Sequence, residues 1–365
     1  MTNIPFADLY RQYPEIKHEI FAEIEKVFEK CAFTNGFSVK DFESAFAKYC
    51  QTKYSIAVNS GTSALHLALA SLDIKEGDEV IVPANTFIAT AWAVAYQKAV
   101  PVFVDCDPLT WEIDPEQVQA KISKRTKAVI GVHLYGQSFD VDAVKRMVSD
   151  KGIFLIEDAC QAHGATYKGN AAGSLADMGC FSFYPGKNLG TYGEGGAITT
   201  NNEKLAERIS SLRNHGSTAR YYHDEIGYNM RMGGVEAAVL NVKLRYIDKW
   251  NDNRKEIAKK YLSGIGNKKI KFQVMPGYTS SVYHLFVVTV ECRDEFIAHL
   301  NKHGISPGLH YPVPCHLQKA FEYLGYKKGD LPNAEYLAEH CVSLPMFPEL
   351  TNGEVLHVIE AVNSF

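Results

Sequence analysis

The sequence predicts an α/β protein in which a mixed, mainly parallel sheet lies between layers of helices. From about residue 54 to 215, short apolar runs alternate with segments in which apolar residues recur at helical spacing. Several of the runs are apolar throughout, which is typical of strands that helices cover on both faces. The length of 365 residues leaves room for a large domain and a smaller one.

Each element follows from its local pattern. Short apolar runs predict strands over residues 54–60, 79–84, 100–105, 126–134 and 152–158. Helical spacing predicts helices over residues 62–72, 86–97, 114–122 and 140–150. In sheets of this kind ligands bind at the carboxyl ends of the strands, so we expect the functional residues there.

The pattern changes in the last third of the chain. Residues 243–262 have the spacing and charge of one long amphipathic helix, and residues 282–290 form an apolar run that predicts a strand. A further helix is expected near 293–304. We therefore expect residues 1–245 to form a large domain, which includes the N-terminal segment, and residues 246–365 to form a small C-terminal α/β domain.

Composition and charge exclude several classes of protein. A formal net charge of −4 gives no reason to expect a nucleic-acid partner. The eight cysteines form no C-x-x-C pair, which predicts a reduced protein with neither a disulfide framework nor a metal site. The polar N-terminus lacks a signal-peptide core, and no apolar stretch is long enough to cross a bilayer. We therefore expect a soluble, cytoplasmic protein with no membrane partner.

A single lysine, Lys187, lies in the glycine-rich segment FYPGKNLGTYGEGGAI at residues 181–196. A Walker phosphate loop needs G-x-x-x-x-G-K-[ST], but the glycine before Gly186 is Gly179, and Asn188 replaces the hydroxyl residue. A dinucleotide-binding turn needs three glycines, and NSGTSALH has one. A lysine in an apolar pocket is a candidate for Schiff-base chemistry, because desolvation disfavours its ammonium form.

Schiff-base chemistry on amino groups needs an electron sink, and pyridoxal phosphate is the common one. Asp158 ends a predicted strand, where its carboxylate could pair with the pyridine nitrogen. The turn at residues 60–63 precedes a helix whose N-terminal amides could hold the phosphate. Ser182 could add a hydroxyl, and Phe87 could lie against the ring.

Each of these residues also has an ordinary structural explanation. An aspartate at a strand end usually caps a turn, Ser-Gly-Thr-Ser is a common N-cap, and Phe87 suits a core position. His163 and Cys160 suit positions packed under the sheet. The occurrence of all five features in the order phosphate cap, aromatic, acid, serine and lysine favours the cofactor site.

Six ordered motifs resemble one known family. They are SGTSALHLAL, VPANTFIATA, IEDACQAHGA, FSFYPGKNLGTYGEGGAI, GYNMRM and HYPVPCHLQ. In order and spacing they are similar to the sugar aminotransferases of the DegT/DnrJ/EryC1/StrS group, which are pyridoxal-phosphate enzymes of fold type I. The resemblance extends from IPFADL near the N-terminus to SLPMFPEL near the C-terminus.

The resemblance implies a role for each matching residue. Lys187 would form the Schiff base with the cofactor, and Asp158 would contact its pyridine nitrogen. Gln161 would approach the ring hydroxyl, and Phe87 the ring face. The residues implied in holding the phosphate are Gly61, Thr62, Ser63 and Ser182. Asn229, in GYN, would reach the phosphate of a neighbouring subunit, which implies an obligate homodimer with two shared active sites.

The same resemblance implies a substrate. QAHGA and FYPGKNLG look most like enzymes that act at C3 of a dTDP-linked 3-keto-6-deoxyhexose in amino-sugar biosynthesis, with L-glutamate as donor. Tyr184, His310 and Tyr311 would then hold the sugar and its nucleotide. NSGTSAL and RMGGVEAA depart from the common C3 pattern. They leave open a C4 aminotransferase that acts on a dTDP-, UDP- or GDP-linked 4-keto-6-deoxyhexose.

Other classes fit the sequence less well. A sugar 3-dehydratase of this fold has histidine in place of the lysine. A pyridoxal-phosphate-dependent transcription regulator would carry a helix-turn-helix segment, and we expect no N-terminal extension that could hold one. A non-catalytic sugar-binding protein has no need for both the lysine and the acid. An NAD-linked oxidoreductase is disfavoured by the missing glycine fingerprint.

Overall fold

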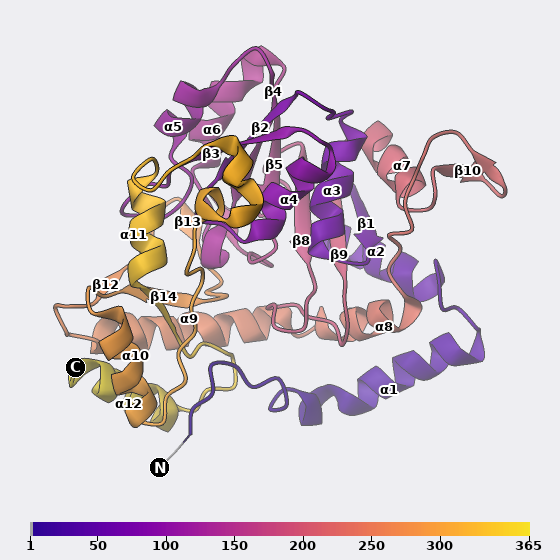
Figure 1. The fold of residues 1–365 in the computed structure, drawn as a ribbon. Helices are drawn as coiled ribbons and strands as arrows, with labels where there is room; N and C mark the ends of the chain where they lie inside the picture. Colours follow the sequence, from indigo (N-terminus) through magenta and orange to yellow (C-terminus); the bar gives the residue numbers. More distant parts are fainter. Residues whose placement is uncertain (1–2) are drawn as a thin grey trace.

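A computed structural model describes residues 3–365 and confirms the predicted α/β class (Figure 1). The strands of its central sheet are β1 (Tyr54–Val58), β2 (Glu79–Pro83), β3 (Val100–Val104), β4 (Thr126–Val132), β5 (Phe154–Asp158), β8 (Met178–Ser182) and β9 (Gly196–Thr200). In the described residues this sheet has seven strands in the order β1-β9-β8-β5-β4-β2-β3. Strands β8 to β3 pair in parallel, whereas β9 is antiparallel to both of its neighbours. The sheet is therefore mixed and mainly parallel, as predicted.

Helices surround this sheet and continue into the C-terminal part of the chain. They are α1 (Tyr13–Glu29), α2 (Phe37–Tyr49), α3 (Gly61–Ser71), α4 (Ile88–Tyr96), α5 (Pro115–Lys121), α6 (Val141–Val148), α7 (Glu203–Leu212), α8 (Gly234–Lys243), α9 (Ile247–Gly264), α10 (Arg293–Lys302), α11 (Pro332–His340) and α12 (Asn352–Asn363). The remaining strands are β6 (Thr166–Tyr167), β7 (Asn170–Ala171), β10 (Ser217–Ala219), β11 (Tyr222–His223), β12 (Lys271–Phe272), β13 (Thr279–Ser280), β14 (Phe286–Thr289) and β15 (Cys341–Leu344).

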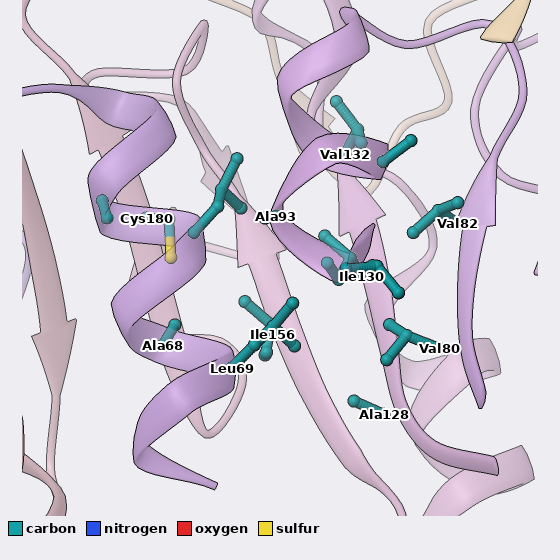
Figure 2. Packing of buried hydrophobic residues seen from close by; sticks show 14 of the residues in the cluster. Ala68, Leu69, Val80, Val82, Ala93, Ala128, Ile130, Val132, Ile156 and Cys180 are labelled. Carbon is teal, nitrogen blue, oxygen red and sulfur yellow. The ribbon is translucent and has the colours of Figure 1, made fainter. Parts of the chain in front are cut away.

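Helices cover both faces of the central sheet because its strands carry apolar side chains on both sides. On one face, Val80 and Ile156 belong to the same buried cluster as Leu69 of α3, and Figure 2 shows these side chains pointing toward one another. The adjacent strand residues Ile81 and Leu155 point to the opposite face and pack against α5 and α6. Each fully buried aliphatic side chain of this kind contributes about 1.5–3 kcal/mol to folding.

A second core lies in the C-terminal part of the chain. Strand β14 pairs antiparallel with β12 and β15, and this small sheet packs with α9, α10 and α12. Ile4 joins the same core and forms a parallel bridge with Ile305. Residues 315–341 contribute instead to the core of the large sheet. An N-terminal residue thus packs in the C-terminal core, and a C-terminal segment packs in the core of the large sheet. The division into two domains at residues 245 and 246 stays a prediction.

The structure corrects two predicted elements. The long helix predicted over 243–262 is present as α9 but begins later than predicted, because a break separates the end of α8 at Lys243 from the start of α9 at Ile247. Tertiary contacts hold this break: the ammonium of Lys243 donates to the carbonyl oxygen of Gly190 at 2.8 Å. The strand predicted over 282–290 is confined to β14, since residues 282–285 instead bond to the backbone of residues 135–136.

Strands β8 and β9 flank the lysine segment and were not predicted. Both are five residues long and each contains a glycine, so their apolar signal is weak. Glycine is required at position 179 because β8 packs closely against the backbone of Gly173 at this point. A Cβ on residue 179 would lie 2.4 Å from the Cα of Gly173. These two strands fix both ends of the segment that carries Lys187.

A buried carboxylate on β5 fixes the segment that precedes β8. Glu157 accepts hydrogen bonds from the backbone amides of Gly173 (2.6 Å), Leu175 (2.8 Å) and Ala176 (2.9 Å). The imidazole of His133 lies 2.8 Å from the same carboxylate, and both side chains are fully buried. Glu157 therefore satisfies several buried polar groups at once, which makes its removal costly.

We expect Glu157→Ala to lower the free energy of unfolding by about 3–5 kcal/mol, because it leaves His133, two buried amides and one half-buried amide without this acceptor. Urea denaturation followed by circular dichroism measures this change. Glu76→Ala, at an exposed position, is the matched control and should change stability by less than about 0.5 kcal/mol. A loss below about 1 kcal/mol for Glu157→Ala would contradict this role.

Candidate active site

Most of the predicted site residues line one cavity of about 720 Å³ at the carboxyl edge of the parallel strands. The predicted residues in its lining are Gly61, Thr62, Phe87, Asp158, Gln161, Ser182, Tyr184, Lys187, His310 and Tyr311. They come from the N-termini of α3 and α4, the ends of β5 and β8, the β8–β9 segment and the loop after Gly308. The fold thus brings together residues that are up to 250 positions apart, from Gly61 to Tyr311 (311 − 61 = 250).

Two predicted residues do not line this cavity. The hydroxyl of Ser63 lies 3.0 Å from that of Ser60, and Ser60 lines the cavity in its place. Asn229 is exposed and forms an antiparallel bridge with Asn214 outside the cavity. Its role toward a neighbouring subunit stays a prediction.

Backbone hydrogen bonds hold the segment that carries Lys187. The amide of Phe183 donates to Gly195 at 2.7 Å, and the amide of Lys187 donates to Tyr184 at 2.9 Å. The side-chain amide of Asn188 donates to Asn251 of α9 at 2.8 Å. Burial lowers the pKa of the Lys187 ammonium below its usual value, although Cys160 and Asp158 oppose this shift. The amine is therefore easier to deprotonate than that of an exposed lysine.

Asp158 is the last residue of β5, and its carboxylate is buried at the cavity wall. One of its oxygens accepts a hydrogen bond from the hydroxyl of Thr90 on α4 at 2.7 Å, and the other accepts from the amide of Cys160 at 3.2 Å. These bonds orient the carboxylate. Because the buried carboxylate of Asp158 is negatively charged, it favours a positively charged group of a ligand in this cavity.

The N-terminus of α3 forms an anion cradle. Ser60 is the N-cap, and its hydroxyl accepts from the amide of Ser63 at 3.1 Å. In residues 3–365 no hydrogen bond engages the amides of Gly61 and Thr62, which lie at the cavity. Free amides at a helix N-terminus bind phosphate well, because the helix dipole adds to their hydrogen bonds.

Gln161 orients Tyr311. The side-chain oxygen of Gln161 accepts from the amide of Tyr135 at 2.7 Å, and its nitrogen donates to the hydroxyl of Tyr311 at 3.0 Å. Because Tyr311 accepts this bond, its own proton is free to point into the cavity. Burial, together with Asp158, raises the pKa of Tyr311, so its hydroxyl remains a donor. The ring of Phe87 lies 5.6 Å from that of Tyr311.

His310 is held as a neutral imidazole. Its Nδ1 lies 2.8 Å from the hydroxyl of Ser343, and Phe6 stacks on its ring at 5.3 Å. Burial and the nearby Lys187 lower the pKa of His310 to about 4. The hydroxyl of Tyr135 donates to the carbonyl oxygen of His310 and so fixes the backbone at this point.

Sequence reasoning missed several residues of the wall. Arg254 of α9, His284, Glu349 and the N-terminal segment 6–12 contribute to the cavity. Arg254 occurs in a helix rich in charge, where its pattern resembles that of an exposed face. The motif IPFADL was a signal for the N-terminal segment, but nothing in its local pattern indicates contact with residues more than 300 positions away.

His163 lies outside the cavity wall. Its imidazole is fully buried against the rings of Phe181 and Phe183, at 5.4 and 5.6 Å. Within the described residues neither ring nitrogen has a hydrogen-bond partner. Burial, together with Lys187, lowers the pKa of His163 to about 3. The structure therefore indicates a packing role for this neutral ring.

Comparison with known proteins identifies the family. Residues 14–363 match the DegT/DnrJ/EryC1/StrS aminotransferase family. The chain belongs to this family. It is 44% identical to a dTDP-3-amino-3,6-dideoxy-alpha-D-galactopyranose transaminase of Aneurinibacillus thermoaerophilus, with 99% of each chain covered. It is 43% identical to a dTDP-3-amino-3,4,6-trideoxy-alpha-D-glucose transaminase of Streptomyces venezuelae, with 99% of this chain and 96% of the relative covered.

Solved structures of this aminotransferase family superpose closely. DesV of S. venezuelae, in complex with a ketimine intermediate, has a TM-score of 0.98 at 43% identity, with 100% of this chain and 98% of DesV covered. NtdA of Bacillus subtilis, with bound cofactor PMP, has a TM-score of 0.92 at 31% identity, with 99% and 85% covered. These comparisons confirm the fold, the aminotransferase class and the dependence on pyridoxal phosphate.

The cavity fits this cofactor. The free amides of α3 suit a phosphate, Asp158 suits a protonated pyridine nitrogen, and Lys187 lines the same cavity. Across residues 3–365 no cluster of three or more histidine, cysteine or acidic side chains is arranged to hold a metal ion. No helix in that part of the chain has the length and apolarity to cross a membrane.

Gly61→Ala should weaken binding of pyridoxal phosphate by about tenfold or more, which corresponds to losing one charge-assisted hydrogen bond. A Cβ at this position would lie 2.6 Å from that of Ser182 and so displace the N-terminus of α3. Titration of cofactor-free protein, followed by absorbance, gives the dissociation constant. Gly353→Ala, where no atom lies within 4 Å of the added Cβ, is the control. An unchanged dissociation constant for Gly61→Ala would contradict the cradle.

The buried His163 predicts a pH effect on stability. A free histidine has a pKa of about 6.5. As the pH falls below this value, the unfolded chain binds a proton at His163 that the native state does not bind, so the free energy of unfolding decreases. Relative to His163→Leu, the wild type should lose about 2–3 kcal/mol between pH 6.5 and 4.5. Urea denaturation at both values tests this. His18→Leu, on the exposed face of α1, is the control, and an equal pH dependence in wild type and His163→Leu would refute the assignment.

Proposed function

We propose that this enzyme transfers the amino group of L-glutamate to C3 of a dTDP-linked 3-keto-6-deoxyhexose in the cytoplasm. The observation that carries the proposal is the placement of the Lys187 amine, the Asp158 carboxylate and the free amides of α3 around one cavity. The two curated relatives are named as transaminases for dTDP-sugars that carry an amino group at C3, which supports the regiochemistry. A relative of Acidithiobacillus ferrooxidans, 38% identical, is named for the same carbon of a UDP-sugar.

The cofactor supplies an electron sink that stabilises negative charge at the substrate carbon. Lys187 would move the proton: in each half of the reaction its amine would take a proton from one of the two carbons joined to the transferred nitrogen, one in the substrate and one in the cofactor, and deliver it to the other. Its lowered pKa suits both directions, because the free amine and the ammonium are then closer in energy. Asp158 would stabilise a positive charge at the pyridine nitrogen, and the bonds from Thr90 and Cys160 fix the orientation of its carboxylate.

Three residues are placed to bind the sugar. Tyr311 offers a hydroxyl proton that Gln161 orients toward the cavity. His310 offers a neutral ring at the same wall, and Tyr184 presents an exposed side chain at the opening. Neutral donors and acceptors suit the hydroxyl and keto oxygens of a hexose.

The proposal includes a homodimer with shared active sites. Asn229 lies outside the cavity of its own chain and is exposed, so a second subunit is needed if it is to touch a phosphate. The rings of Tyr221 and Tyr222 are also exposed, on the neighbouring hairpin β10–β11. Sedimentation of the wild type tests whether the protein is a dimer. The cofactor affinity of Asn229→Ala tests whether Asn229 contacts the phosphate.

Lys187→Ala should abolish turnover, a loss of at least about 10³-fold, while the protein still binds pyridoxal phosphate non-covalently. The assay incubates enzyme with L-glutamate and a panel of dTDP-, UDP- and GDP-linked 3-keto and 4-keto sugars. Mass spectrometry and NMR then identify the aminated carbon. Lys204→Ala, exposed on α7, is the matched control. Retained activity in Lys187→Ala would contradict the assignment, and amination of C4 alone would contradict the proposed regiochemistry.

A further inference from the structure

Arg254 is a buried cation in the wall of the active-site cavity. It lies on α9 and is 6% exposed. Its Nη1 donates to the backbone carbonyl oxygens of Tyr283 (3.2 Å), His284 (3.3 Å) and Met346 (2.9 Å). These three bonds fix one end of the guanidinium and leave its other donors for a different partner.

The remaining edge of the guanidinium is unpaired. In the part of the chain that the structure describes, Nε is buried without any acceptor, and Nη2 makes no hydrogen bond. Burial lowers the pKa of Arg254 to about 10, against the opposing effect of Glu349, so the group stays charged at neutral pH. Nε and Nη2 present two parallel N–H groups, and this fork matches the two oxygens of a carboxylate.

The charges of the surrounding wall leave Arg254 available to an anion. Besides Lys187, it is the only lysine or arginine among the residues that line the cavity in the described chain. His284 and His310 are neutral, since burial and nearby cations lower their pKa values. Glu349 is a neighbouring acid whose charge acts on Arg254, but within residues 3–365 no ion pair joins the two, and one Glu349 oxygen is buried without a partner.

Contacts through His284 connect Arg254 to the segment that carries Lys187. Arg254 donates to the carbonyl oxygen of His284, and the ring of His284 contacts the side chain of Asn188, the residue that follows Lys187. The side-chain oxygen of Asn188, 3.2 Å from Nδ1, accepts from His284 because the nitrogen of that amide already donates to Asn251. An anion on the Arg254 fork would therefore bind close to the reacting amine.

We propose that the Nε–Nη2 edge of Arg254 binds a carboxylate of the amino donor. The inference rests on the proposed function, in which one cavity receives an amino acid and a nucleotide-linked sugar in turn. The donor carries carboxylates, which the planar fork binds with two parallel hydrogen bonds. The pyrophosphate of the sugar nucleotide is the other oxyanion that could occupy this edge, and the two halves of the reaction distinguish them.

The test measures the two half-reactions separately in the holoenzyme. The donor half-reaction uses L-glutamate alone and follows the cofactor absorbance and the formation of 2-oxoglutarate. The sugar half-reaction starts from a dTDP-3-amino-3,6-dideoxyhexose and follows the same absorbance change. For Arg254→Met the half-saturating glutamate concentration should rise by about 10- to 100-fold, as expected for loss of a charged hydrogen-bonded pair. The half-saturating concentration of the amino sugar should change by less than about threefold.

Arg254→Lys keeps the charge but loses the fork, so it should show a smaller rise, of about tenfold or less, for glutamate. This variant also tests the proposal if Arg254→Met fails to fold. Arg245→Met is the matched control, because Arg245 pairs with Glu19 on α1 and does not line the cavity. A binding measurement adds a readout besides activity. Calorimetric titration of glutarate into the pyridoxamine-phosphate form should give a dissociation constant that rises in Arg254→Met and stays unchanged in Arg245→Met.

The outcomes separate this inference from the proposed function. An unchanged glutamate requirement in Arg254→Met overturns the inference, as does an equal loss in both half-reactions or a loss confined to the amino sugar. If the wild type converts no glutamate and aminates no ketosugar, the proposed function fails whatever the variants show. A loss confined to the donor half-reaction, together with weaker glutarate binding, supports the carboxylate site.

Discussion

The active site depends on the burial of one ammonium group in the same cavity as one carboxylate. Lys187 loses hydration in the cavity, and this lowers its pKa, while Asp158 limits the shift. A lysine in water would remain protonated and unreactive, whereas a fully isolated buried lysine would destabilise the fold. The opposing effect of Asp158, which lines the same cavity, keeps the amine between these limits.

The alternation of side chains along β5 makes this pairing possible. Glu157 and Asp158 are adjacent, so they point to opposite faces of the sheet. Glu157 satisfies buried amides before β8, and Asp158 faces the cavity. One strand therefore both anchors the segment that leads toward Lys187 and supplies the acid opposite it.

Long-range contacts close the other walls of the cavity. Arg11 bonds to Glu354 of α12 and holds the N-terminal segment against the C-terminal core. The same hydrogen bonds lower the pKa of Glu354 to about 2, so the pair stays ionised over the physiological pH range. The guanidinium of Arg254 joins three backbone carbonyls from two loops, one of which also receives a hydrogen bond from Arg11. The cavity thus depends on buried polar bonds as much as on apolar packing.

The local sequence determined the strands and helices that build the large sheet, and the ordered motifs determined the family and most of the site. Continuous apolar runs and helical spacing depend only on near neighbours, and the end of a parallel strand is where a polar residue reaches a ligand. Lys187, Asp158 and the α3 cap were therefore predictable. The break between α8 and α9, the exclusion of Ser63 from the wall, and the inclusion of Arg254 were not. Each of these depends on which distant backbone or side chain lies beside the residue, and only tertiary packing decides that.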